Sequence, residues 1–275
     1  MSSHSSTVAF ITGASSGIGL AIAKRLAADG YVVVGTSRRA RPVSDDGIDY
    51  VALDVTDDAS IRAAIEGVVE KHGRIDILIN NAGVGLSGAA EESSRAQLAT
   101  LFDTNLLGLA EVTNNVLPVM RRQRSGRIVN ISSVFGFAPA PNLAMYAASK
   151  FAVEGYSESL AHELLHFGIR VAIVEPGITT SNFDANIVIA DKPLSVYDSA
   201  RDAAAVTYSK TLENADDPKV VVDTVMRAIT AKNPKLRYPA GKLTHQLTTA
   251  RRLLPEKAFS RVVRSANNLP AVPSR

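Results

Sequence analysis

The sequence predicts an α/β fold: a doubly wound, mostly parallel seven-stranded sheet with helices on both faces. Two observations predict it. Short β-branched runs alternate with longer helical stretches, and several runs, such as VVV, ILI and VAIV, are apolar without alternation, as in strands covered on both faces. The 275 residues are 46% hydrophobic and 21% charged, which excludes wholesale disorder, so we expect a single domain over 1–275.

The expected elements repeat as βαβ units. Strands are expected at Val8–Thr12, Tyr31–Gly35, Tyr50–Leu53, Ile75–Ile79, Arg127–Ile131, Ile169–Val174 and near Leu236. Between them, helices are expected at Ile18–Asp29, Ala59–His72, Gln97–Arg122, Ala144–His166 and Pro218–Thr230. Residues 178–217 interrupt the pattern as a long, irregular insertion. Connections of that length in compact domains are usually functional, so we expect a substrate lid there.

Composition excludes several classes of protein. The chain has no cysteine, which excludes disulfide scaffolds, thiolate catalysis and cysteine-ligated zinc or iron–sulfur centres. The first ten residues, MSSHSSTVAF, lack the basic and apolar regions of a signal peptide. No run reaches the ~18 apolar residues of a membrane span. We therefore expect a soluble, cytoplasmic protein.

A glycine-rich turn follows the first expected strand and leads directly into a helix. Residues 12–19, TGASSGIG, have the spacing G-x-x-x-G-x-G. Glycines permit a tight turn and close backbone approach, and the N–H groups and dipole of a helix N-terminus attract a pyrophosphate. The alternative is a purely structural turn. We expect a nucleotide bound by Gly13, Ser15, Ser16, Gly17, Ile18 and Gly19.

The turn resembles that of the short-chain dehydrogenase/reductase family, and the resemblance continues to about residue 183. It implies a Rossmann-type oxidoreductase. Asn80-Asn81-Ala82-Gly83, after the fourth strand, resembles the family's NNAG segment, which supports the sheet and borders the cofactor. Asp54-Val55 resembles the pair that contacts the adenine. The resemblance therefore places Asn81, Ala82, Gly83, Asp54 and Val55 around a nicotinamide dinucleotide.

The end of the second strand predicts which dinucleotide binds. In dinucleotide folds an acid here, roughly 20 residues past the glycines, accepts hydrogen bonds from the ribose 2′-OH. This chain has Ser37, followed by Arg38, Arg39 and Arg41, which suit a 2′-phosphate. We therefore expect NADP(H), with Arg38 as the main contact, as in the resembling NADP-preferring members. For Arg39 and Arg41 a solvated surface position is the alternative.

Tyr146 and Lys150 form the candidate acid/base pair. They are four residues apart in YAASK, on one face of an expected helix. At ~5 Å the ammonium should favour the phenolate by about 3 kcal/mol, or roughly two pKa units. An oxidised nicotinamide adds positive charge, so Tyr146 is expected to act as a general acid/base. In the second Y-x-x-x-K pair, Tyr238 and Lys242, an intervening Pro and Gly forbid the aligning helix, so that pair is expected to be structural.

The family resemblance assigns further roles around this pair. Ser133, thirteen residues before Tyr146 and with Ser132 as its rival, would hydrogen-bond the substrate carbonyl oxygen. Tyr146 would donate the proton, and Lys150 would hold the nicotinamide ribose and lower the pKa of Tyr146. Asn105 matches the fourth member, which binds a water that links Lys150 to solvent. The alternative for Asn105 is a buried residue that caps or kinks its helix.

Pro176-Gly177, after the sixth strand, resembles the family's PG turn, whose following backbone binds the nicotinamide carboxamide. The usual threonine five residues past the proline is Ser181 here. Its hydroxyl can substitute, with Thr179 and Thr180 as competing candidates.

The substrate side is expected to be apolar. Segments 84–90, 135–145 and the insertion from 178 should surround the reacting carbonyl. No Arg or Lys among them could clamp a carboxylate, so a lipophilic ketone, aldehyde or alcohol is expected. His162 and His166, one helical turn apart, lack clear acidic partners, and no metal is expected. The candidate lining residues, about half of which could instead pack the core, are Phe135, Phe137, Leu143, Met145, Phe183, Ile187 and Ile189.

Positive charge is concentrated near the C-terminus. The net charge of +3 is too small to suggest nucleic acid, but residues 232–275 hold ten Lys or Arg and one acid, Glu256. The tail, 242–275, is expected to form two amphipathic helices joined at Pro255. It loosely resembles the extended tail of hydroxysteroid and retinol dehydrogenase-type members of the family. It either covers the lid or contacts anionic lipid or an acidic carrier protein. The expected apolar positions are Leu243, Leu247, Ala250, Leu254, Phe259, Val262, Val263 and Ala266.

Together these features predict an NADPH-dependent carbonyl reductase or alcohol dehydrogenase. Two alternatives stay open: reduction of 3-oxoacyl thioesters, and a non-catalytic NADPH-binding redox sensor. The complete set of Asn105, Ser133, Tyr146 and Lys150 favours an enzyme over a sensor. The resemblance also implies a homodimer or homotetramer, formed through the helices at 97–122 and 144–166.

Overall fold

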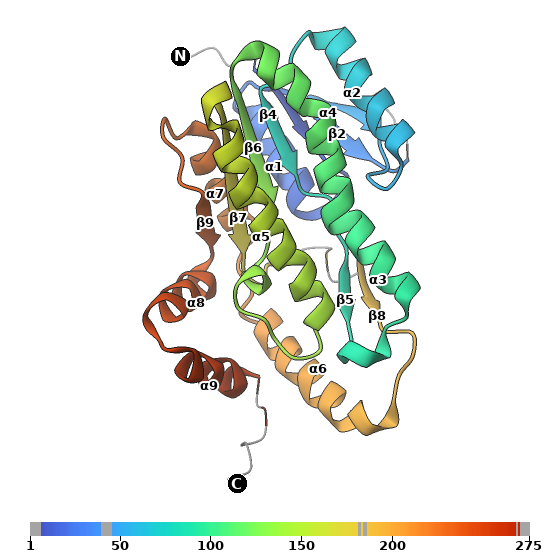
Figure 1. Ribbon diagram of the computed structural model, residues 1–275, viewed down its shortest axis with the longest axis vertical. Coiled ribbons are helices and arrows are strands. Elements are labelled where there is room, and N and C mark those ends of the chain that lie inside the picture. Colours follow the sequence, from blue (N-terminus) through green and yellow to red (C-terminus); the bar gives the residue numbers. More distant parts are fainter. Residues whose placement is uncertain (1–6, 40–45, 181–182, 184–185, 268, 270–275) are drawn as a thin grey trace.

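The computed structural model describes residues 7–39, 46–180, 183, 186–267 and 269. Seven strands form one sheet in the order β3-β2-β1-β4-β6-β7-β9, and every neighbouring pair is parallel. This confirms the predicted doubly wound sheet, with helices on both faces (Figure 1). The strands are β1 (Val8–Ile11), β2 (Val32–Ser37), β3 (Ile48–Ala52), β4 (Ile77–Asn80), β6 (Gly126–Ile131), β7 (Ile169–Pro176) and β9 (Arg237–Ala240).

Each face of the sheet has its own hydrophobic core. Ala9 and Ile11 of β1 pack with α1 (Gly17–Ala28) and α7 (Pro218–Thr230). Val8 and Phe10, which point to the other face, pack with α2 (Asp58–His72), α4 (Gly108–Gln123) and α5 (Ala144–Leu164). Because both faces of β1 are buried, its sequence shows no alternation of polar and apolar residues. Short 3-10 helices lie at η1 (Ala90–Glu92), η3 (Val134–Gly136) and η4 (Leu165–Phe167).

The strand order reverses between β1 and β4. From β1 the chain progresses to β2 and β3 on one side, and from β4 to β6, β7 and β9 on the other. Crossovers therefore leave this point in opposite directions, which opens a crevice at the carboxyl ends of the strands. The segments that follow β1, β4 and β6 meet there.

The helix predicted over 97–122 is interrupted, which corrects that prediction. It consists of α3 (Arg95–Phe102), a π-helical turn η2 (Asp103–Leu107) and α4. Asn105 in this turn is hydrogen-bonded to the backbone of Val84, and a Cβ on Gly108 would lie 2.4 Å from the carbonyl oxygen of Val55. These tertiary contacts shape the turn, so the sequence pattern along the helix could not reveal it.

The insertion at 178–217, predicted to be irregular, contains regular elements. β8 (Ile187–Ile189) pairs in parallel with β5 (Gly85–Ser87) in a small second sheet, and η6 (Ser195–Tyr197) leads into α6 (Asp198–Leu212). α6 buries none of its residues. It therefore lacks the apolar stripe by which a helix is recognised in a sequence. The action of this segment as a lid stays a prediction.

The tail forms the two predicted helices, α8 (Lys242–Leu253) and α9 (Glu256–Ala266). Phe259 packs on Val134 and Ala138 in the segment after β6, and Leu247, Ala250 and Val263 join this cluster. By contrast Leu243, Leu254 and Val262, also predicted to be apolar contacts, are partly exposed. Within the described residues, no helix combines the length and apolar character that a membrane crossing needs.

The two long central helices also expose apolar side chains. Leu107, Phe151 and Leu165, in or next to α4 and α5, are all more than a third exposed. The homo-oligomer expected through these helices stays a prediction.

Candidate active site

The glycine turn after β1 is fastened to the segment that follows β4. Asn81 Nδ2 donates to the carbonyl oxygens of Thr12 and Gly13, both at 3.0 Å. Thr12 Oγ1 accepts the backbone N–H groups of Asn81 and Ala82, at 3.0 and 3.1 Å. The NNAG segment therefore supports the turn through hydrogen bonds to both the backbone carbonyl and the side-chain hydroxyl of Thr12.

The turn has the shape of a phosphate cradle. Gly13 has a φ of +66°, a left-handed conformation that favours glycine. A Cβ on Gly19 would lie 2.3 Å from the carbonyl oxygen of Gly13, so no larger residue fits there. Helix α1 begins at Gly17, and Ser16 makes no side-chain capping hydrogen bond. The first N–H groups of α1 are thus available to an anion.

The end of β2 continues the same crevice. Arg38, Ser37, Asp54 and Val55 line one cavity together with the glycine turn, whereas the exposed Arg39 is not among the lining residues. The backbone N–H of Thr56 donates to the Asp54 carboxylate, and this bond is the main reason that the pKa of Asp54 is lowered. Arg41, the third predicted arginine, lies outside the described residues.

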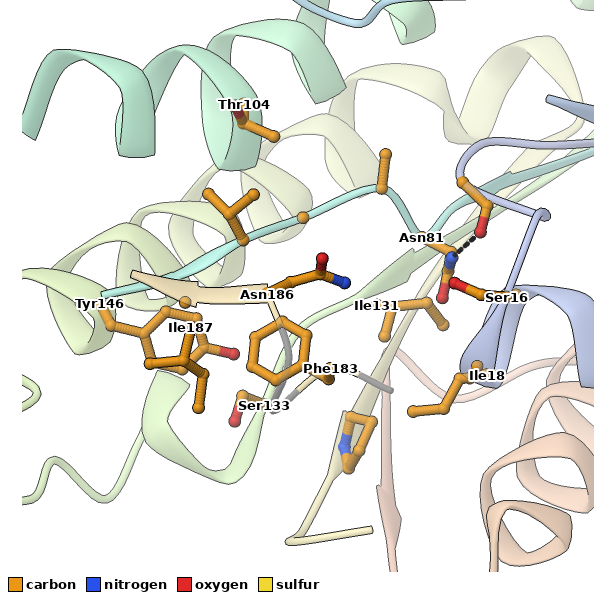
Figure 2. Close-up of a pocket in the computed structure, with 18 of the residues that line it drawn as sticks. Ser16, Ile18, Asn81, Thr104, Ile131, Ser133, Tyr146, Phe183, Asn186 and Ile187 are labelled. Atoms are coloured by element: carbon orange, nitrogen blue, oxygen red, sulfur yellow. Dashed lines mark hydrogen bonds between the residues drawn. The ribbon is translucent and has the colours of Figure 1, made fainter. Parts of the chain in front are cut away.

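Ser133, Tyr146 and Lys150 line the other end of the cavity. Figure 2 shows Ser133 and Tyr146 there. Ser133 follows β6, and its hydroxyl lies close enough to that of Tyr146 to lower the pKa of the phenol. Lys150 Nζ donates to the carbonyl oxygen of Ile131 at 3.0 Å and lies 5.9 Å from the centre of the Tyr146 ring. The structure therefore pairs Ser133, and not its rival Ser132, with the phenol.

Burial dominates the ionisation of this pair. It raises the pKa of Tyr146 to about 12, and the hydrogen bond with Ser133 opposes this rise only in part. Burial also lowers the pKa of Lys150 to about 8, although the charge of Glu154 acts in the opposite direction. In the chain by itself, Lys150 does not offset this burial; the expected lowering of the Tyr146 pKa by Lys150 together with an oxidised nicotinamide stays a prediction. The desolvation of a fully buried phenol exceeds the effect of one amine at this distance.

Asn105 is buried in the π-helical turn and fully engaged. Its Oδ1 accepts the N–H of Val84 at 2.9 Å, and its Nδ2 donates to the Val84 carbonyl oxygen at 3.0 Å and to Ser149 Oγ at 3.1 Å. The side chain thus joins η2, α5 and the chain after the NNAG segment. Its predicted part in a water relay is not tested by these contacts.

The PG turn closes the cavity from the β7 side. Pro176, Gly177 and Thr179 line it, and Thr179 Oγ1 donates to the Gly177 carbonyl oxygen at 3.2 Å. Thr180 is exposed and is not among the lining residues. Ser181, the predicted carboxamide contact, lies outside the described residues, so among the described candidates only Thr179 reaches the cavity.

One cavity of about 410 Å³ joins the glycine turn to the catalytic side chains. Its far end is apolar: the Tyr146 ring lies 6.1 Å from that of Phe135 and 6.0 Å from that of Phe183. Of the predicted lining residues, Phe135, Leu143, Phe183 and Ile187 line it, whereas Phe137, Met145 and Ile189 do not. Tyr208 of α6 was missed because α6 itself was not predicted; Thr100, Thr104 and Asn186 were missed as well. The described residues hold no cluster of three metal-ligating side chains.

The insertion is fastened beside the cavity by a buried carboxylate. Glu92 accepts the backbone N–H groups of Ala89 and Leu194, both at 2.8 Å, and pairs with Arg201 of α6. The bond from Leu194 is the main reason that the pKa of Glu92 lies below its ordinary value. Glu92 therefore joins η1, the segment before η6 and α6 through one charged group.

A second buried carboxyl group lies behind the catalytic helix. Glu175 of β7 is 2% exposed, and its Oε1 lies 3.9 Å from Arg237 Nε, which in turn donates to Glu154 at 2.9 Å. Burial, and after it the charge of Glu154, raise the pKa of Glu175 from 4.5 to about 7, against the opposing charges of Arg237 and Arg252. Glu175 thus holds its proton more tightly in the folded chain than in the unfolded one.

This difference predicts a pH-dependent stability. Since the folded-state pKa is raised, the contribution of Glu175 is fully present below pH 4.5 and is lost as the pH rises through about 7. Glu175→Gln should remove this loss, which amounts to at most about 3 kcal/mol. Urea unfolding of wild type and variant at pH 5 and pH 8 measures it. The control is Glu158→Gln, an exposed partner of the same Arg237. Parallel pH profiles for wild type and Glu175→Gln would contradict the assignment.

Comparison with known proteins places the chain in a family. A family model described as short chain dehydrogenase matches residues 7–192. The chain is 37% identical over 243 residues to 3-ketodihydrosphingosine reductase of Bacteroides thetaiotaomicron, covering 87% of this chain and 90% of that protein. It is 34% identical to human retinol dehydrogenase 8 over 286 residues, covering 94% and 88%. The chain therefore belongs to the short-chain dehydrogenase/reductase family of oxidoreductases that act on CH–OH and C=O groups.

Solved structures agree with this assignment. A short-chain dehydrogenase from Streptomyces avermitilis superposes with a TM-score of 0.79 at 34% identity, over 94% of this chain and 99% of that one. An actinorhodin polyketide ketoreductase, solved with NADPH, superposes with a TM-score of 0.73 at 30% identity, over 87% and 97%. The family resemblance found in the sequence motifs is thereby confirmed.

Proposed function

We propose that this chain is an NADPH-dependent oxidoreductase that interconverts lipophilic ketones or aldehydes and their alcohols. The observation that carries this proposal is the single cavity that runs from the glycine turn to Ser133 and Tyr146 and ends among apolar side chains. The glycine cradle and the open N-terminus of α1 fit a dinucleotide pyrophosphate. When bound, NADPH supplies the hydride for reduction of the carbonyl carbon.

The dinucleotide contacts follow from the lining of the cavity. Arg38 and Ser37, which line the cavity, would bind the 2′-phosphate, and Asp54 and Val55, which line it as well, would contact the adenine. Asn81, Ala82 and Gly83 line the middle of the cavity, and Pro176, Gly177 and Thr179 border the expected nicotinamide end. Structures of relatives solved with NADPH support this choice of cofactor.

The proton is handled by the chain's own residues. Ser133 and Tyr146 present two hydroxyls to one point, where a carbonyl oxygen can accept both hydrogen bonds. With a pKa near 12, Tyr146 is protonated at neutral pH and can donate its proton as charge develops on that oxygen. Lys150, whose pKa is about 8, is close enough to stabilise the phenolate that remains.

The apolar end of the cavity predicts how substrate length affects the rate. Each methylene buried among Phe135, Phe183 and Ile187 contributes about 0.8 kcal/mol, so kcat/KM should rise up to about fourfold per added CH₂ until the cavity is filled. A homologous series of 2-ketones, monitored by the loss of NADPH absorbance, measures this. Keto acids of equal length are the control. They should be poorer substrates because the described residues at the apolar end include no cation that could pair with their carboxylate.

Three other outcomes of the same assay would redirect the proposal. A rate independent of chain length would show that the apolar end is not the substrate site. If 3-oxoacyl thioesters were turned over faster than free ketones of the same length, the enzyme would be a thioester reductase. A complete absence of turnover with every carbonyl tested, together with NADPH binding, would favour the redox sensor.

A further inference from the structure

The turn between α8 and α9 exposes apolar and basic side chains together. Leu253 is 76% exposed, and Leu254 and Pro255 beside it are exposed as well. Arg251, Arg252 and Lys257, on either side, are also exposed. We call Arg251–Lys257 the α8–α9 corner. In Figure 1 it lies at the outer edge of the molecule, away from the sheet.

The opposite side of the same helices is firmly packed. Phe259 is 3% exposed among Val134 and Ala138, and Thr244 is fully buried next to Gly177. Arg251 stacks over the Phe259 ring, with its guanidinium carbon 4.9 Å from the ring centre. The α8–α9 corner is therefore held in place from behind, so its exposed leucines are a fixed feature of the surface.

The cations of the corner form no close ion pair among the described residues, although the charge of Arg252 acts on the buried Glu175. From 242 to 267 the chain carries six Lys or Arg and one acid, Glu256. Among the described residues, Arg251, Arg252, Lys257 and Arg261 form no ion pair. Positive charge around an exposed apolar wedge complements a surface that is anionic outside and apolar beneath.

We infer that the α8–α9 corner docks on the surface of an anionic lipid bilayer, with Leu253 and Leu254 among the acyl chains and the arginines at the headgroups. A bilayer fits better than an acidic protein because Leu253, which is 76% exposed, protrudes between cations. The helices on either side of the corner pack on the segment 134–138, and Phe135 of that segment lines the apolar end of the cavity. Docking thus brings that end of the molecule to the membrane. This inference does not depend on the proposed function.

Vesicle flotation of the full chain tests this inference. Wild type should float with vesicles of phosphatidylcholine and phosphatidylglycerol and stay behind with phosphatidylcholine alone. Arg251→Glu/Arg252→Glu should lower partition at least about tenfold. Leu253→Asp, which leaves the charge of the arginines in place, should lower it about tenfold as well. Thermal unfolding of each variant verifies its fold.

The matched control is Arg121→Glu/Arg122→Glu, an exposed arginine pair at the end of α4 that carries the same charge. It should float as wild type does. Equal loss in both double variants would show that net charge, and not the corner, governs adsorption. Equal partition of Leu253→Asp and wild type would overturn insertion. Wild type that ignores anionic vesicles but binds a purified acidic acyl carrier protein would replace the bilayer with a protein partner.

Discussion

Tyr146→Phe should keep the affinity for NADPH and lower turnover by a factor of 10² or more, the scale on which a positioned general acid/base acts. The substitution removes only the phenolic oxygen. The ring keeps its packing against Phe135 and Phe183, so the cavity retains its shape. Steady-state turnover of a ketone, together with NADPH binding followed by fluorescence, separates the chemical step from cofactor binding.

Tyr238→Phe provides the matched control. Tyr238 belongs to the other Y-x-x-x-K sequence, but Arg237–Ala240 is strand β9, and the Tyr238 hydroxyl accepts the backbone N–H of Lys235. Loss of the Tyr238 hydroxyl should leave the turnover of the ketone unchanged. A Tyr146→Phe enzyme that works within a few-fold of the wild-type rate would refute the assignment of Tyr146 as the proton donor.

Arg38→Asp should reverse the choice of dinucleotide. The wild-type arginine can form charge-assisted hydrogen bonds with a 2′-phosphate, whereas an aspartate repels the phosphate and accepts hydrogen bonds from a 2′-OH. Loss of such bonds costs about 1.5–3 kcal/mol, so the ratio of the affinities for NADPH and NADH should fall roughly 10- to 100-fold. Titration of both dinucleotides into wild type and variant measures the ratio.

Arg39→Asp is the comparison for this experiment. Arg39 is next in sequence and exposed, but it does not line the cavity. Its replacement changes the net charge equally and should shift the ratio far less. An unchanged ratio in Arg38→Asp, or wild type that binds NADH as tightly as NADPH, would remove the proposed NADP preference.

The sheet could be predicted from the sequence because its signals are local. Strands such as β1 and β7 are buried on both faces and therefore consist mostly of apolar residues, which can be recognised in the sequence. Helix α7 matches its predicted bounds because Pro218 and the Asp217 cap begin it and its buried face is strongly apolar. The catalytic side chains could be found for a similar reason, since Tyr146 and Lys150 need only one helix to bring them together.

The features that could not be predicted from the sequence depend on contacts between segments that are far apart in the chain. The π-helical turn follows from Asn105 meeting Val84, and the pairing of β5 with β8 joins segments about 100 residues apart. The pKa of Tyr146 depends on how deeply the fold buries the phenol, which spacing in a helix does not reveal. An exposed helix such as α6 has no periodic pattern of apolar residues in its sequence. Because α6 was not predicted, its residue Tyr208 was not predicted to line the cavity.

The way Glu92 fastens the insertion has a consequence for how the enzyme can diversify. None of the residues of α6 is buried, and its Arg201 pairs with the Glu92 carboxylate, so most positions of α6 tolerate replacement at little cost in folding free energy. Selection can therefore remodel the entrance of the pocket while Ser133, Tyr146 and the glycine turn stay fixed in the sheet and its helices. Related enzymes of one lineage can in this way carry out the same reaction on many different substrates.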